Sequence, residues 1–124
     1  MIERLDHVNL RTADLEGLAR FYTDVLGLLQ GERPPLGFPG AWLYAGEKPV
    51  IHLVSVAEQP QPVGELRLEH FAFSAHGLRE FLARLTRLNI DFKQSRQPGT
   101  GNFVVNLRDP DGNRVHVDFP TSEA

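Results

Sequence analysis

Apolar residues recur in two stretches of the 124-residue chain at the three- and four-residue spacing of an amphipathic helix. Gly27 follows the first stretch, at a place where helices often end in a left-handed residue, and Asn89 follows the second. The pattern predicts one core-packed helix in each half of the chain. The apolar positions are Leu15, Leu18, Tyr22, Val25 and Leu26 in the first helix, and Leu78, Phe81, Leu82, Leu85 and Leu88 in the second.

After each helix, the chain has three candidate β-strands, of which "AWLYA", "VIHLVSV", "NFVVNLR" and "RVHVDF" are the most apolar. Turns that contain glycine or proline separate these runs. In "DPDGN" at 109–113, the Asp-Gly pair is typical of a tight hairpin. The predicted strands cover 28–33, 41–45 and 50–56 in the first half, and 91–97, 102–108 and 114–119 in the second.

The two halves repeat one pattern. Each half is expected to fold as strand–helix–strand–strand–strand, an α+β arrangement. The predicted half-modules span 1–57 and 67–120, and a polar, proline-rich linker spans 58–66. A module of this size has too little core to stand alone, so the two should pair into one domain over 1–124. A shift of 63 residues places Leu5, Asp6, His7 and Leu15 on Leu68, Glu69, His70 and Leu78.

The composition limits the partners and the kinds of metal site that the chain can have. The net charge of -3 and the scattered basic residues give no footprint for nucleic acid or an anionic membrane surface. No apolar run approaches the roughly 20 residues of a membrane span, and the N-terminus lacks a signal-peptide core, so we expect a cytoplasmic protein. The chain has no cysteine, so a metal site would need histidine, carboxylate and water ligands.

Four of the five histidines fall on predicted strands in the frame of the repeat. His7 and His70 lie early in the first strand of each half, and His52 and His116 lie within the last. His7, His70 and His116 share the more polar strand face, opposite the bulky apolar residues, whereas the face of His52 is less clear. Four histidines in one register favour a shared metal site. His76 lies outside the frame and is expected to be solvated.

The stretch 33–47, "RPPLGFPGAWLYAGE", suggests a substrate pocket. Trp42 and Tyr44 share one strand face and could form an apolar wall, and Arg33 could bind a carboxylate. The alternative is that the aromatic rings belong to the core and that Arg33 is solvated. Asn9, on the face of His7, is a further candidate for substrate contact.

Two segments resemble the vicinal oxygen chelate superfamily, which includes glyoxalase I, bleomycin- and fosfomycin-resistance proteins and extradiol dioxygenases. They are "LDHVNLRTADLEGLARFYTDVLGL" at the N-terminus and "LRDPDGNRVHVDF" near the C-terminus. The resemblance covers nearly the whole chain. It implies two paired βαβββ modules that form an open, curved barrel around one divalent metal ion, here Zn, Ni, Mn or Fe.

The resemblance also implies the metal ligands, which would be His7, His52, His70 and His116. Most relatives carry glutamate at the position of His116, and glyoxalase I carries one at the position of His52. Four neutral imidazoles would leave a divalent ion with its full charge, which favours an anionic substrate. Without that carboxylate, a hydroxide or His116 itself would serve as catalytic base. Asp118 could orient a histidine.

Three functions follow from these patterns. The leading hypothesis is a metalloenzyme that chelates vicinal oxygens of a small molecule and promotes isomerase- or lyase-type proton transfer. The alternatives are an iron-dependent dioxygenase and a metal-free, drug-binding resistance protein. A homodimer is also expected, because the open edge of each curved sheet favours pairing within or between chains.

Overall fold

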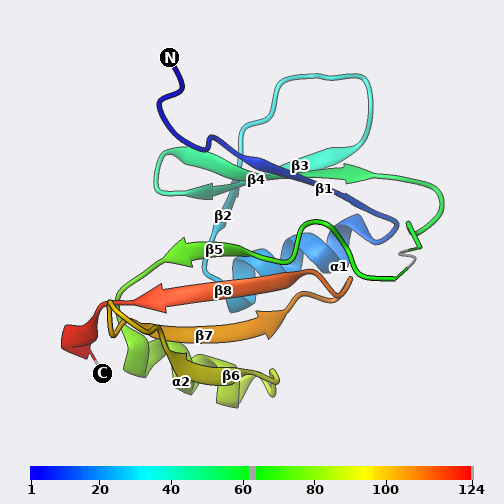
Figure 1. Cartoon of the computed structure of the whole chain (residues 1–124). Coiled ribbons are helices and arrows are strands. Elements are labelled where there is room, and N and C mark those ends of the chain that lie inside the picture. Colours follow the sequence, from blue (N-terminus) through cyan, green and yellow to red (C-terminus); the bar gives the residue numbers. More distant parts are fainter. Residues whose placement is uncertain (62–63, 124) are drawn as a thin grey trace. The chain divides into compact units, whose positions relative to one another are not determined.

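The computed structural model describes residues 1–61 and 64–123. The chain divides into two compact units, Met1–Pro62 and Val63–Ala124 (Figure 1). Each unit contains one four-stranded sheet and one main helix. The predicted α+β fold with two βαβββ modules is therefore confirmed. No helix within the described residues is long and apolar enough to cross a membrane.

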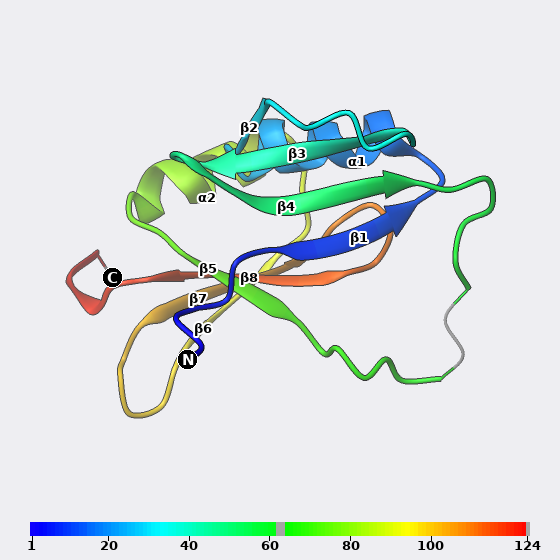
Figure 2. The same cartoon turned by 90° about the horizontal axis from the view of Figure 1, so that it is seen from above.

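In the first unit, the first and last strands pair in parallel and the other pairs are antiparallel. The strand order is β1-β4-β3-β2, and Figure 2 shows β4 between β1 and β3. Helix α1 packs against β3 and β4, which lets its apolar face cover the sheet. The elements are β1 (Val8–Thr12), α1 (Leu15–Arg20), η1 (Phe21–Val25), β2 (Leu29–Gly31), β3 (Gly40–Ala45) and β4 (Lys48–Ser55).

The second unit repeats this topology. Its strand order is β5-β8-β7-β6, again with a parallel pair between the first and last strands (Figure 1). The rings of Phe81 on its helix and Phe119 on β8 lie 5.5 Å apart and join the helix to the sheet. The elements are β5 (Phe71–Ser74), α2 (Leu78–Arg87), β6 (Lys93–Arg96), β7 (Phe103–Arg108), β8 (Arg114–Phe119) and a 3-10 turn, η2 (Thr121–Glu123).

The helix ends follow the local sequence. Asp14 caps α1 by accepting a hydrogen bond from the backbone N–H of Gly17. The predicted first helix is confirmed, but its second half is the π-helical segment η1. Gly27 and Asn89 both adopt left-handed backbone angles, with φ of 78° and 59°, where the two helical segments end. These are the two positions at which the sequence predicted termination.

The strand bounds differ slightly from the prediction. His7 and His70 lie one residue before β1 and β5, so they precede the strands. Strands β2 and β6 are shorter than predicted, and all four residues of β6 are exposed. The predicted linker 58–66 includes residues 62–63, which lie outside the described part of the chain. Its described residues belong to no helix or strand.

The predicted "DPDGN" hairpin turn is confirmed and depends on a buried carboxylate. One oxygen of Asp109 accepts the backbone N–H groups of Asp111 and Asn113, at 3.0 and 2.9 Å. Its other oxygen accepts the side-chain amide of Asn113 at 2.8 Å. Gly112 supplies the positive φ of 88° that the turn requires. Asp109 thus fixes the register of β7 and β8.

We predict that Asp109→Ala lowers the free energy of unfolding by about 2–3 kcal/mol, because it removes a buried carboxylate and leaves the part-buried donors of the turn without their acceptor. Urea unfolding followed by circular dichroism measures this change. Asp91→Ala is the matched control, because Asp91 is an exposed aspartate of the same unit and its loss should change stability by less than about 0.5 kcal/mol. Equal effects of the two substitutions would contradict the role of Asp109.

Candidate functional site

The parallel pairing of β1 with β4 brings two histidines together in the first unit. Asn9 is in register with His52, and His7 lies two residues before Asn9 on the same face. The rings of His7 and His52 stack with centroids 3.8 Å apart and planes 10° apart. Trp42 lies opposite His52 on β3 and stacks on it at 4.0 Å. His52 is thus held between an imidazole and an indole, and it is buried.

The second unit forms the equivalent histidine pair. Ala72 on β5 is in register with His116 on β8, and His70 lies two residues before Ala72. The rings of His70 and His116 stack at 3.8 Å with planes 14° apart. The partner of His116 on β7 is Asn106, where the first unit has a tryptophan. The imidazole pair is therefore repeated, but the third ring is not.

An acidic residue holds the first histidine of each pair. Nδ1 of His7 lies 2.8 Å from Oδ2 of Asp6, and Nδ1 of His70 lies 2.7 Å from Oε2 of Glu69. A proton on Nδ1 donates to the carboxylate and leaves the lone pair of Nε2 free for another partner. The hydrogen bond from the neighbouring histidine lowers the pKa of Asp6, and likewise that of Glu69.

The sequence interpretation missed these two carboxylates as site residues. Adjacent residues of a strand point to opposite faces, so an Asp-His or Glu-His pair within a strand would not meet. Both pairs instead precede their strands, where side chains of neighbouring residues can reach each other. The available signal was an acidic residue before a histidine at the same place in both repeats.

The second histidine of each pair has a different environment. Nε2 of His52 lies 3.0 Å from the carbonyl oxygen of Pro49 and donates to it, which leaves the lone pair on Nδ1. Nε2 of His116 is buried and has no hydrogen-bond partner within the described residues. Asp118 was expected to orient a histidine. Its Oδ1 is also buried without a hydrogen-bond partner in that part of the chain, and the carboxylates that contact imidazoles are Asp6 and Glu69.

Burial lowers the pKa of both second histidines. For His52, desolvation is the largest cause and the neighbouring His7 is the next. For His116, desolvation is again the largest cause, followed by His70. Both effects favour a neutral imidazole, which is the form that binds metal ions or accepts a proton.

The predicted substrate residues Arg33, Trp42 and Tyr44 line one pocket of about 450 Å³ together with Glu32 and Pro34. The hydroxyl of Tyr44 donates to the backbone oxygen of Glu32 at 2.5 Å, which fixes this wall. Arg33 donates to the carbonyl oxygen of Phe38 at 2.9 Å, and its Nε is buried without a partner among the described residues. Asn9 is exposed and does not line this pocket.

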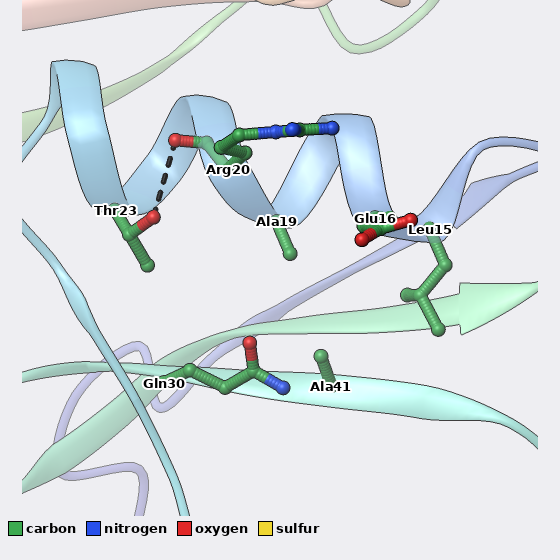
Figure 3. A pocket seen from close by; sticks show the side chains of 7 residues that line it. All are labelled: Leu15, Glu16, Ala19, Arg20, Thr23, Gln30 and Ala41. Atoms are coloured by element: carbon green, nitrogen blue, oxygen red, sulfur yellow. Dashed lines mark hydrogen bonds between the residues drawn. The ribbon is translucent and has the colours of Figure 1, made fainter.

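A second pocket of about 470 Å³ lies between the first helix and strands β2 and β3 (Figure 3). Its lining contains no histidine, and the sequence interpretation did not predict it. The Thr23 hydroxyl donates to the backbone oxygen of Arg20 at its rim. The lining residues are Leu15, Glu16, Ala19, Arg20, Thr23, Gln30 and Ala41.

A family model described as Glyoxalase/Bleomycin resistance protein/Dioxygenase superfamily matches residues 4–117. The chain therefore belongs to this superfamily, as the sequence resemblance indicated. Among curated protein sequences, none matches the chain.

Solved structures of the family share the fold over almost the whole chain. A lactoylglutathione lyase from Agrobacterium tumefaciens is 26% identical, with a TM-score of 0.71 over 98% of this chain and 96% of that one. A putative glyoxalase family protein from Bacillus anthracis is 22% identical, with a TM-score of 0.79 over 97% of each chain. The genomically encoded fosfomycin resistance protein FosX from Listeria monocytogenes is 15% identical, with a TM-score of 0.72 over 98% and 96%. The last two likenesses concern the fold alone.

The donor set of each pair fits a divalent transition metal. Imidazole nitrogens suit Zn, Fe and Ni, and a carboxylate on the far ring nitrogen is the usual support of a metal-binding histidine. Within the described residues, no group of three or more His, Asp or Glu side chains is arranged to hold a metal. The structure therefore brings His7 to His52 and His70 to His116, as two pairs.

The lowered pKa values predict that the metal-free protein loses stability in acid. The unfolded chain protonates His52 and His116 near the ordinary value of 6.5, whereas the fold keeps them neutral to lower pH. Their stabilising contribution is thus complete above about pH 6.5 and is lost as the pH falls through the lower, folded-state values.

NMR titration of the imidazole protons measures these values, with the urea-unfolded chain as control. The single tryptophan, Trp42, stacks on His52, so its fluorescence should report the same protonation. Both midpoints should lie below those of the unfolded chain. A midpoint for His52 at or above its unfolded value would contradict the assignment.

Proposed function

We propose that this protein is a divalent-metal-dependent enzyme that acts on a small molecule with vicinal oxygens by lyase- or isomerase-type proton transfer. The observation that carries the proposal is the repeated pair of stacked imidazoles, each with a carboxylate on Nδ1 of its first histidine. Superfamily membership and the 26% identity with a lactoylglutathione lyase support the reaction class.

The proposed ligands are His7, His52, His70 and His116, two from each unit. Nε2 is the available nitrogen in His7, His70 and His116, whereas His52 would bind through Nδ1 because its Nε2 donates to Pro49. A bound divalent ion would supply Lewis-acid polarisation of the substrate oxygens. The residues of the chain would orient the substrate and hold its proton.

His116 is also the proposed site of proton transfer if it does not bind the metal. Its Nε2 is buried and has no hydrogen-bond partner among the described residues, and the lowered pKa keeps it neutral near pH 7. A neutral, unpartnered imidazole nitrogen can accept a proton without first breaking another hydrogen bond. Metal affinity and activity of a His116 variant separate the two roles.

The pocket beside Trp42 is the proposed substrate-binding region. Its volume of about 450 Å³ suits a small molecule. Trp42 joins it to the first histidine pair, because the same indole lines the pocket and stacks on His52. The charge of Arg33 acts on His52 as well. An anionic group on the substrate would therefore place the neighbouring oxygens near the imidazoles.

Metal analysis of the purified protein tests the proposal and separates the alternatives. Zinc, nickel or manganese supports the proposed enzyme, and iron supports a dioxygenase. A protein that binds none of these metals would instead be a metal-free, small-molecule-binding protein of the resistance type. The homodimer expected from the open sheet edges stays a prediction.

Alanine substitutions locate the metal. Zinc affinity should fall by more than about tenfold in each of four variants, His7→Ala, His52→Ala, His70→Ala and His116→Ala. Loss of a hydrogen bond to a ligating histidine already has an effect of about that size, so loss of the ligand itself should have a larger one. Calorimetric titration measures it. His76→Ala is the control, since His76 is exposed and lies in neither pair. A His116→Ala variant that keeps zinc but loses activity would assign the base role, and unchanged affinity in all four variants would refute the metal site.

Arg33→Met should weaken binding of mandelate, an aromatic 2-hydroxy acid with vicinal oxygens, by about tenfold, because a charge-assisted hydrogen bond is lost. Trp42 fluorescence measures the binding. Arg96→Met is the matched control. Like Arg33, Arg96 donates to a backbone carbonyl oxygen and lies over a phenylalanine ring, but it belongs to the other unit. Equal affinity in wild type and Arg33→Met would remove Arg33 from the pocket's function.

A further inference from the structure

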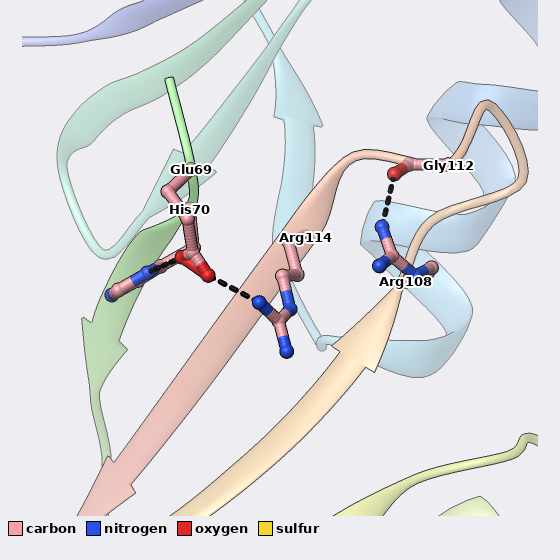
Figure 4. A network of polar contacts seen from close by, with 5 residues as sticks. All are labelled: Glu69, His70, Arg108, Gly112 and Arg114. Carbon is pink, nitrogen blue, oxygen red and sulfur yellow. Dashed lines mark hydrogen bonds and ion pairs between the residues drawn. The ribbon is translucent and has the colours of Figure 1, made fainter. Parts of the chain in front are cut away.

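The carboxylate of Glu69 is held at both of its oxygens. Oε2 accepts from Nδ1 of His70, and Oε1 accepts from the guanidinium of Arg114 (Figure 4). Arg114 begins β8, two residues before His116, so its side chain shares the face of that histidine. A single strand thus carries both His116 and the cation that contacts the support of His70.

The first unit lacks this second contact. Asp6 accepts from His7, but no arginine or lysine in the described part of the chain forms an ion pair with it. The reason lies in the sequence, because Val50 precedes His52 by two residues where Arg114 precedes His116. The two histidine–carboxylate pairs therefore differ in the acidic residue, aspartate or glutamate, and in the presence of an arginine on it, so His7 serves as an internal comparison for His70.

We propose that Arg114 is a positioning residue that acts through Glu69 on His70. A carboxylate held at one oxygen can rotate and can accept from either direction, whereas one held at both oxygens is fixed in its plane. The fixed carboxylate keeps the proton of His70 on Nδ1 and keeps the ring parallel to His116. Nε2 of His70 is then permanently available to a metal ion. That last step rests on the proposed function, but the control of the tautomer does not.

Loss of Arg114 should change the metal affinity only modestly, and should change the tautomer of His70 measurably. Its side chain and that of Glu69 are partly exposed, at 36% and 58%, so solvent screens the ion pair. Glu69 contacts the proposed ligand His70 directly, so the loss of its charge should weaken metal binding by about 10–100-fold. Loss of Arg114 should weaken it by about two- to fivefold.

The first experiment reads the tautomer of His70 without metal. Ring nitrogen shifts are measured by NMR at about pH 8.5, where an ordinary imidazole is neutral. Wild type should show a proton on Nδ1 of His70, and Arg114→Met should increase the fraction with the proton on Nε2. Arg114→Lys, which restores the charge, should recover part of the difference. His7 should not respond to any of these substitutions.

Arg108→Met is the matched control. Arg108 is in register with Arg114 on the adjacent strand and donates to the backbone oxygen of Gly112 at 3.0 Å, away from Glu69 (Figure 4). Its removal changes the net charge by the same amount and should leave the tautomer of His70 unchanged. An equal shift in Arg108→Met and Arg114→Met would overturn the proposal.

The second experiment is a double-mutant cycle with zinc as the probe. If Arg114 acts through Glu69, Arg114→Met should lower zinc affinity in wild type and have no further effect in Glu69→Gln. Full additivity would overturn the proposal, as would an unchanged His70 tautomer in Arg114→Met. Failure of wild type to bind zinc would refute the proposed function alone, because the tautomer measurement still decides the role of Arg114.

Discussion

The parallel pairing of the first and last strands is the constraint on which the candidate site depends. In each unit, one histidine lies on the last strand and the other precedes the first strand. The pairing places the two diagonally opposite each other on the same face of the sheet. The result is a stacked pair with the same ring separation, 3.8 Å, in both units. A slip of one residue in either register would turn one imidazole to the opposite face of the sheet. In the second unit, the turn at Asp109 holds the last strand, β8, in register with its other neighbour, β7.

The residues around the stacked imidazole pair differ between the two units. In the first unit, Trp42 stacks on His52 and lines a pocket together with Arg33, the proposed substrate-binding region. The second unit adds Arg114 behind Glu69, which fixes a carboxylate. The first unit therefore has a third aromatic ring beside its imidazole pair, and the second unit has a cation on the carboxylate that contacts its first histidine.

The sequence predicted the elements and the repeat frame of the four histidines, because both follow from local pattern. Strand periodicity, turn residues and the repeat each point to one answer, and together they placed His7, His52, His70 and His116 in one frame. Asp6 and Glu69 were missed as site residues because the alternation rule applies only inside a strand, and both lie just before one. Two other contacts depend on side-chain rotamers and strand register, which the hydrophobic periodicity of the sequence does not encode. They are the hydrogen bond from His52 to Pro49 and the contact of Arg114 with Glu69.

The two carboxylates change the electrostatic argument that the ligand types alone suggest. Four neutral imidazoles would leave a divalent ion with its full charge, but Asp6 and Glu69 lie 2.8 and 2.7 Å from the far nitrogen of two of these rings. A carboxylate in that place makes the imidazole a more basic metal ligand. It thus supplies, through the ring, part of the negative charge that a carboxylate ligand would bring. In the proposed site, this charge would come from residues that are not themselves ligands of the metal.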